Sequence, residues 1–252
     1  MGHPDPIAFS VFGIDIRWYG ILIAFGMLLA VYISCKRAPR HGITDDDVLD
    51  IAIWMLPIGV IGARVYYVIF NLDYYKTLSS MLDIRSGGLA IHGGLLFSII
   101  TVLIICRRKK IDALNVFDLF VPTVALAQSI GRWGNFFNGE AYGSPVTDPA
   151  WQFFPFAVYA DGGWHLATFF YESCWNLLGF ILLWLYRKRA RREGNVFFCY
   201  LEWYGLGRAF IEGLRADSLM WGPVRVSQAL SLALCIGSMA IFLYRNKKQP
   251  TG

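Results

Sequence analysis

The sequence predicts an all-α polytopic membrane protein with about seven transmembrane helices, in a single integral membrane domain over residues 1–252. Composition is the first reason, because 56% of the residues are apolar and only 16% are charged, whereas a soluble domain carries about 25% charged residues. Long apolar runs are the second reason, since about 20 apolar residues cross a hydrocarbon core of ~30 Å as a helix. Basic clusters that alternate along the chain are the third.

Seven apolar runs are long enough to span the membrane. Residues 18–35 and 226–244 contain no Asp, Glu, Lys, Arg or His, and residues 87–106 contain only His92. Charged side chains interrupt the other four runs, which are 48–70, 113–131, 169–186 and 194–214. The N-terminal 17 residues have neither a basic start nor a small-residue cleavage site, so the first span is expected to stay as an anchor.

The basic residues predict the orientation. Most Lys and Arg residues lie in four clusters that follow every second span, at 36–40, 107–110, 187–192 and 245–248. The loops on the opposite side, 71–86, 139–168 and 215–225, are nearly free of such clusters. Because basic loops stay in the cytoplasm, the N-terminus is predicted outside and the C-terminus inside. Anionic lipid headgroups account for the net charge of +5, with no nucleic-acid partner.

With this topology, costly polar residues gather at one depth. A charged side chain at the centre of a bilayer costs roughly 2.5 kcal/mol or more. The direction of each span places several such residues in its outer half, whereas the inner half keeps little beyond Asp50, Asp118 and Glu202. Six spans are therefore expected to contribute to a site near the outer leaflet, through Tyr19, Arg64, His92, Arg132, Glu172 and Arg208.

Two segments carry most of this polarity. Residues 131–143 place four polar side chains within nine positions, interleaved with glycines, which favours a site where the backbone approaches a ligand: Arg132, Asn135, Asn138 and Glu140. The alternative is an interfacial turn whose arginine reaches the headgroups. In the sixth span, Tyr204, Arg208 and Glu212 are spaced by four, so they share one helical face. An internal ion pair that only serves packing is the alternative there.

Two or three arginines in the outer leaflet favour an anionic ligand. The planar guanidinium group donates paired hydrogen bonds to phosphate. The spans contain neither a glycine-rich nucleotide loop nor paired carboxylates for a metal, and the five cysteines are scattered, so we expect no metal, no cofactor and no disulfide framework. An amphiphile with a phosphate headgroup, entering sideways from the bilayer, is the expected ligand.

Three other classes of protein compete with an enzyme of lipid chemistry. A transporter or flippase would line both halves of the membrane with polar groups and show broken helices in matching repeats. An intramembrane hydrolase would need a nucleophile beside its base, and Ser129 has no obvious partner in the sequence. A purely structural subunit would gain nothing from the clustered charges, which are energetically costly within a membrane.

The sequence resembles the prolipoprotein diacylglyceryl transferase family. The longest match is Gly131-Arg132-x-x-Asn135-Phe136-x-Asn138-Gly139-Glu140-x-x-Gly143. Shorter matches cover most of the chain: Arg17-Trp18-Tyr19-Gly20, Gly62-Ala63-Arg64, His92-Gly93-Gly94, Tyr171-Glu172 and Tyr204-x3-Arg208-x3-Glu212. The predicted seven-span topology is also that of the family. One departure is Ala167-Thr168-Phe169, where the family often has Pro-Thr-Gln before the Tyr-Glu pair.

The resemblance implies an enzyme of lipoprotein biosynthesis in the bacterial cell membrane, with its active site near the outer leaflet. Its substrates would be phosphatidylglycerol and the signal peptide of a preprolipoprotein, and membrane lipids would surround it. The diacylglyceryl group would be transferred to the lipobox cysteine as a thioether, and glycerol phosphate would be released. Arginines would stabilise the charge of the leaving phosphate, and a base would ionise a thiol of pKa about 8.5.

Each candidate residue then receives an expected role. Arg132 and Arg208 hold the phosphoglycerol group, and Glu212 orients Arg208. His92, the only histidine within a span, is the candidate base, although it could instead bind lipid. The remaining candidates are expected to bind or orient the substrate: Tyr19, Arg64, Asn135, Asn138, Glu140, Gly143 and Tyr204.

Overall fold

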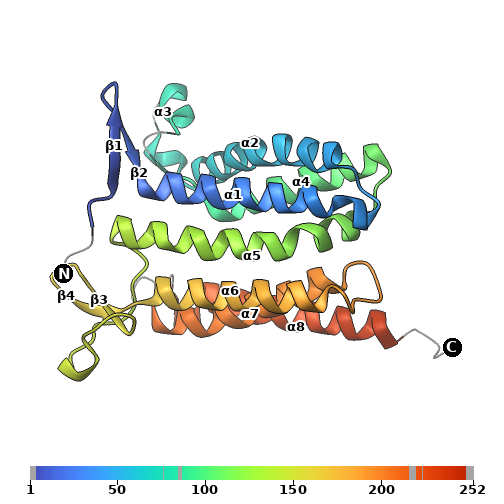
Figure 1. Cartoon of the computed structure of the whole chain (residues 1–252). Coiled ribbons are helices and arrows are strands. Elements are labelled where there is room, and N and C mark those ends of the chain that lie inside the picture. Colours follow the sequence, from blue (N-terminus) through green and yellow to red (C-terminus); the bar gives the residue numbers. More distant parts are fainter. Residues whose placement is uncertain (1–3, 76, 85–86, 216–219, 223, 248–252) are drawn as a thin grey trace. The chain divides into compact units, whose positions relative to one another are not determined.

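The structure is a computed structural model that describes residues 4–75, 77–84, 87–215, 220–222 and 224–247. It is mostly helical, as predicted (Figure 1). The chain divides into two compact units, which we describe separately: unit 1 is Met1–Tyr32 with Phe117–Gly252, and unit 2 is Ile33–Val116. The last basic cluster ends at Lys248, and the predicted outer loops include positions 76, 85–86, 216–219 and 223; these lie outside the described residues.

Each predicted span contains a long helix, although the helix of the third span begins at Ile91 and not at residue 87. The seven long helices are α1 (Trp18–Arg37), α2 (Asp45–Ile69), α4 (Ile91–Lys109), α5 (Ala113–Asn138), α6 (Thr168–Tyr186), α7 (Asn195–Leu214) and α8 (Val226–Lys247). Among the described residues, six helices are long and apolar enough to cross a membrane. The seventh, α7, carries Glu202, Arg208 and Glu212 and is not one of the six. The chain is therefore a multi-pass membrane protein, while the count of seven spans and their orientation stay predictions.

Short strands and helical turns lie in the loops, where the sequence predicts only connections. Three antiparallel hairpins pair β1 (Ile7–Val11) with β2 (Ile14–Arg17), β3 (Ala157–Ala160) with β4 (Gly163–Leu166), and β5 (Met220–Trp221) with β6 (Val224–Arg225). Four short helical turns are η1 (Ala38–His41), η2 (Leu72–Tyr74), α3 (Leu78–Leu82) and η3 (Pro149–Trp151). The second hairpin turns at Asp161 and Gly162, which both have positive φ, as the commonest two-residue hairpin turn requires.

In unit 2, α2 packs along α4 through small residues. A Cβ built on Gly93 would lie 2.4 Å from the carbonyl oxygen of Gly62, so the two backbones meet directly. At the other end of this pair, Nζ of Lys109 lies 2.6 Å from carboxylate oxygens of both Asp47 and Asp50. Helix α2 begins with a capping box between Thr44 and Asp47.

In unit 1, α7 packs against both α6 and α8, and the three run side by side (Figure 1). A buried apolar cluster joins α6 and α7 to α5 through Val121, Ala125, Leu183, Val196 and Tyr200. The start of α7 is held by a buried carboxylate, because Asp118 of α5 accepts hydrogen bonds from the backbone N–H groups of Gly194 and Phe197, both at 2.7 Å. A carboxylate at a helix N-terminus is favourable, which explains Asp118 in a predicted span.

Candidate functional site

The motif of residues 131–143 begins inside a helix rather than after one. The predicted span ended at residue 131, but α5 continues to Asn138, so Arg132 and Asn135 share a face of its last two turns. Close packing explains the extension. A Cβ on Gly134 would lie 2.7 Å from Cδ2 and 3.1 Å from Cα of Tyr19. The end of α5 therefore runs against the start of α1.

A carboxylate on α6 joins two of the candidate arginines, both in unit 1. Nη2 of Arg132 donates a short hydrogen bond to Oε1 of Glu172, and Nη1 of Arg208 lies 3.4 Å from Oε2 of the same carboxylate. On α7, Nη2 of Arg208 lies 2.6 Å from Oε2 of Glu212, the i,i+4 contact that the sequence spacing predicts. These four side chains, Arg132, Glu172, Arg208 and Glu212, form what we call the arginine–glutamate network.

Burial differs between the two signs of charge in this network. The side chains of Arg132 and Arg208 are 24% and 18% exposed, whereas those of Glu172 and Glu212 are 5% and 3% exposed. The carboxylates therefore lie behind the guanidinium groups. A guanidinium group has five N–H donors, and these ion pairs engage only some of them. The arrangement fixes two cations in position and leaves their outer sides accessible to an anion.

A second set of contacts extends the network along the motif. Oδ1 of Asn135 accepts from Nη1 of Arg132 at 3.3 Å, while Nδ2 of Asn135 donates to Oε1 of Glu140 at 2.9 Å. Nδ2 of Asn138 donates to the same oxygen of Glu140 at 3.2 Å. The structure thus brings together four polar residues of the motif, as the sequence predicts.

The remaining candidates of unit 1 lie around this network in different ways. Tyr204 precedes Arg208 by one turn of α7 and stacks on Tyr200, with ring centroids 6.0 Å apart. Gly143 packs where α6 begins and α7 ends, and a Cβ there would lie 2.7 Å from the carbonyl oxygen of Leu214. Its backbone N–H donates to Leu166 at 2.8 Å. Gly143 therefore has a packing reason to be glycine that is independent of substrate.

The departure from the family pattern lies in an aromatic cluster. Phe169 is buried, and its ring stacks on Phe136 at 5.1 Å and meets Trp133 edge to face at 5.8 Å. Thr168 Oγ1 donates to the carbonyl of Ala141 at 2.7 Å. The cluster packs the start of α6 against the end of α5, beside Arg132 and Glu172.

Arg64 of unit 2 binds backbone rather than a carboxylate. Its buried guanidinium group donates to the carbonyl oxygens of Ser80, Met81, Gly87 and Gly88 at 2.6–3.1 Å. These contacts attach α3 and the two glycines, Gly87 and Gly88, to α2. The substrate-binding role expected of Arg64 stays a prediction, and the geometry gives this residue a loop-holding role.

His92 lies in the first turn of α4, also in unit 2, and is exposed. Its ring is 6.3 Å from that of Tyr66. Because Arg64 and His92 belong to the other unit, the meeting of all six spans at one site stays a prediction. Within unit 1, residues of α1, α5, α6 and α7 do come together.

Glu172 is the residue whose importance the sequence reading missed. The sequence predicts it in the outer half of its span and in the Tyr-Glu match, but gives it no role. Its two arginine partners are 36 and 40 residues away, so no local spacing could pair them. The available signal was that Glu172 is the only acidic residue of its span, since a buried carboxylate requires a cation.

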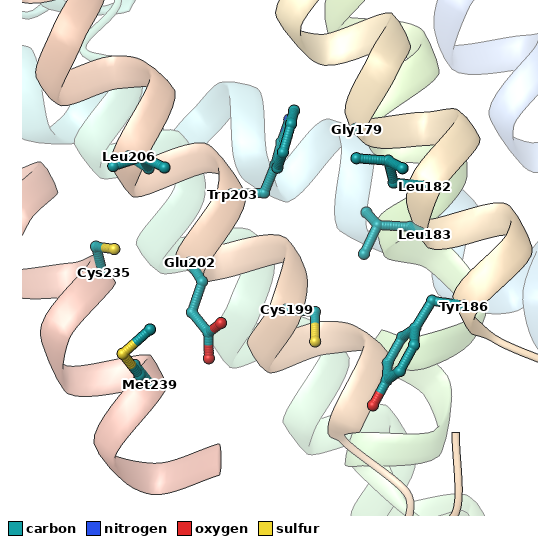
Figure 2. Close-up of a pocket in the computed structure, with 10 residues that line it drawn as sticks. All are labelled: Gly179, Leu182, Leu183, Tyr186, Cys199, Glu202, Trp203, Leu206, Cys235 and Met239. Atoms are coloured by element: carbon teal, nitrogen blue, oxygen red, sulfur yellow. The ribbon is translucent and has the colours of Figure 1, made fainter. Parts of the chain in front are cut away.

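A cavity of about 330 Å³ lies elsewhere in unit 1, between α6, α7 and α8 (Figure 2). Its lining is mainly apolar, with Glu202 as its one carboxylic side chain among the described lining residues: Gly179, Leu182, Leu183, Tyr186, Cys199, Glu202, Trp203, Leu206, Cys235 and Met239. None of these is a predicted site residue. The network is thus a partly exposed polar surface and not part of this cavity.

Comparison with known proteins agrees with the resemblance. The model of the family described as prolipoprotein diacylglyceryl transferase matches residues 6–244. A protein of Finegoldia magna named phosphatidylglycerol–prolipoprotein diacylglyceryl transferase is 46% identical over 247 residues, which is 97% of each chain. Proteins of the same name from Clostridioides difficile and Streptococcus sanguinis are 48% and 46% identical, covering 97% of this chain and 96% and 97% of their own. The chain therefore belongs to the prolipoprotein diacylglyceryl transferase family.

Proposed function

We propose that the arginine–glutamate network is where this chain carries out its reaction. The reaction transfers the diacylglyceryl group of phosphatidylglycerol to the lipobox cysteine of a preprolipoprotein and releases glycerol phosphate. One observation carries the placement: two partly exposed guanidinium groups, on α5 and α7, share a buried carboxylate on α6. Three helices thereby present fixed positive charge within one polar surface of unit 1.

The charges match the chemistry at each step. The cysteine sulfur forms a bond to the terminal glyceryl carbon, and the carbon–oxygen bond to the phosphate breaks with its electron pair on oxygen. Negative charge therefore develops on the phosphate as it leaves. Arg132 and Arg208 stabilise that charge, because cations already held in place need no reorganisation during the reaction.

The carboxylates act through the arginines. Glu172 holds both guanidinium groups, and Glu212 fixes the rotamer of Arg208 through the 2.6 Å contact. Glu140, with Asn135, orients the headgroup beside Arg132. Tyr19 and Tyr204 flank these residues from α1 and α7 and contribute to the same binding surface.

The cysteine thiol must lose its proton, and we assign to His92 the role of the base that accepts it. The assignment rests on the family match at His92-Gly93-Gly94 and on histidine being the side chain that most often serves as a general base. A His92→Gln variant with full turnover at neutral pH would remove it as the base. The site is placed near the outer leaflet, because the alternating basic clusters orient α5 and α6 with the network at their outer ends.

The experiment uses purified protein with phosphatidylglycerol and a lipobox peptide, and measures the release of glycerol phosphate. Release must depend on the cysteine, so a peptide with serine at that position is the substrate control. Arg132→Ala is expected to abolish release while the protein remains membrane-inserted. Arg108→Ala, at an exposed arginine in the last turn of α4, is the matched control and should keep wild-type activity. Near-normal release by Arg132→Ala would refute the placement of the site.

A further inference from the structure

Two tryptophans bind each other across the α6–α7 contact. The indole Nε1 of Trp175 on α6 donates to the backbone oxygen of Trp203 on α7, and Nε1 of Trp203 donates to the backbone oxygen of Trp175, both at 3.0 Å. The two rings stack, with centroids 4.2 Å apart and planes 15° apart. In a hydrocarbon surrounding, an unpaired indole N–H is costly, so these two hydrogen bonds favour one relative position of the helices.

Each tryptophan is followed by a glycine four residues later, and the partner's ring lies on that glycine. A Cβ on Gly207 would lie 2.0 Å from Nε1 of Trp175, and a Cβ on Gly179 would lie 2.5 Å from Nε1 of Trp203. Figure 2 shows Gly179 and Trp203 beside the same cavity. The pattern Trp-x3-Gly thus occurs once on each helix, and both copies are used. We call these four residues the tryptophan clasp.

The clasp adjoins the arginine–glutamate network. Trp175 follows Glu172 by three residues, so the two share a face of α6 with an axial offset of ~4.5 Å. Gly207 is the residue before Arg208 on α7. The contact that must be kept across these helices, from Arg208 to Glu172, is already long at 3.4 Å.

Both indole hydrogen bonds cross the same contact, so any slide of α6 past α7 changes the lengths of both at once. A slide by the rise of a single residue, ~1.5 Å, in the sense that separates the two residues would lengthen the 3.4 Å contact from Arg208 to Glu172. The tryptophan clasp therefore fixes the register of α6 and α7 at the turn that carries Glu172 and Arg208.

We propose that Trp175 and Trp203 are positioning residues for diacylglyceryl transfer, which set the register of α6 and α7 so that Glu172 can hold Arg208. This inference rests on the proposed function of the network. The tryptophans act on the reaction only through the helix register and do not touch substrate. The two glycines are required because they admit the rings.

The test compares variants of the full-length enzyme in detergent, with rates expressed per folded protein from the monodisperse fraction. Gly207→Ala should displace the Trp175 ring and lower kcat/KM by about tenfold or more, since misplacement by ~1 Å can cost up to 100-fold. Gly237→Ala on α8 is the matched control, because a Cβ there meets nothing within 4 Å. Trp175→Phe and Trp203→Phe keep a ring, remove one hydrogen bond each, and decide the matter if Gly207→Ala does not fold.

A double variant separates positioning from a general loss of packing. If the damage of Gly207→Ala comes from the displaced ring, Trp175→Ala combined with Gly207→Ala should match Trp175→Ala alone, because the two sites are coupled. Wild-type kcat/KM per folded protein in Gly207→Ala, or in both Trp→Phe variants, would overturn the proposal, as would additive effects in the double variant. Arg208→Ala, run in parallel, tests the proposed function itself, since its activity should be lost whether or not the clasp matters.

Discussion

Replacing Glu172 by glutamine removes the negative charge that holds both arginines and leaves the size of the side chain almost unchanged. The side chain is 5% exposed and contacts Arg132 and Arg208. A glutamine oxygen can still accept one hydrogen bond, but its amide nitrogen would face a cation. We expect Glu172→Gln to keep both arginines at the site but to hold their guanidinium groups less firmly.

The magnitude follows from the geometry. A hydrogen bond to a charged group contributes about 1.5–3 kcal/mol, and the short contact to Arg132 is of this kind. The 3.4 Å contact to Arg208 adds less, because that guanidinium group keeps Glu212 at 2.6 Å. If this energy is lost in the transition state, kcat falls about 10- to 100-fold, at 1.36 kcal/mol per decade. KM for phosphatidylglycerol should change little, because both guanidinium groups are still present to attract the phosphate.

The assay is the initial rate of glycerol phosphate release over a range of phosphatidylglycerol concentrations, per folded protein. Glu193→Gln, at an exposed carboxylate before α7, is the matched control. A kcat of Glu172→Gln within twofold of wild type would refute the argument that this carboxylate positions the arginines.

Three further outcomes follow from single contacts. Asp118→Asn should weaken the cap of α7 and lower the free energy of unfolding by about 1–2 kcal/mol, seen as a lower Tm with kcat/KM per folded protein unchanged. Gly134→Ala places a Cβ 3.1 Å from the Tyr19 backbone, so it should reduce kcat/KM. Gly13→Ala is the control, because a Cβ there meets nothing within 4 Å and affects only the turn between β1 and β2. Arg64→Lys should raise the rate of proteolysis within residues 77–84 and leave KM nearly unchanged. One ammonium group cannot replace the planar guanidinium group that binds several carbonyl oxygens.

The sequence predicts the helices well because apolar length and charge are local properties. Each predicted span contains a long helix, and the i,i+4 spacing alone predicted the Arg208–Glu212 pair that the structure shows. The hairpin at Asp161 and Gly162 also has a local signal, since Asp-Gly is a strong hairpin dipeptide.

Tertiary contacts explain what the sequence did not predict. Glu172 pairs with residues on two other helices, and Asp118 caps a helix 76 positions later, so neither role has a local signature. Arg64 looked like a ligand-binding cation because backbone carbonyls leave no mark in a sequence. The Trp-x3-Gly pattern is visible on both α6 and α7, but its meaning requires the antiparallel packing of the two helices.

Photochemical labelling tests the central claim most directly. A phosphatidylglycerol analogue with a small diazirine on its terminal glycerol is first shown to be a substrate, then photolysed with the enzyme, and the labelled peptides are sequenced by mass spectrometry. The account predicts labels within residues 131–143 and 204–212, reduced in Arg132→Ala. Labels confined to other segments, from an analogue that the enzyme still turns over, would contradict it.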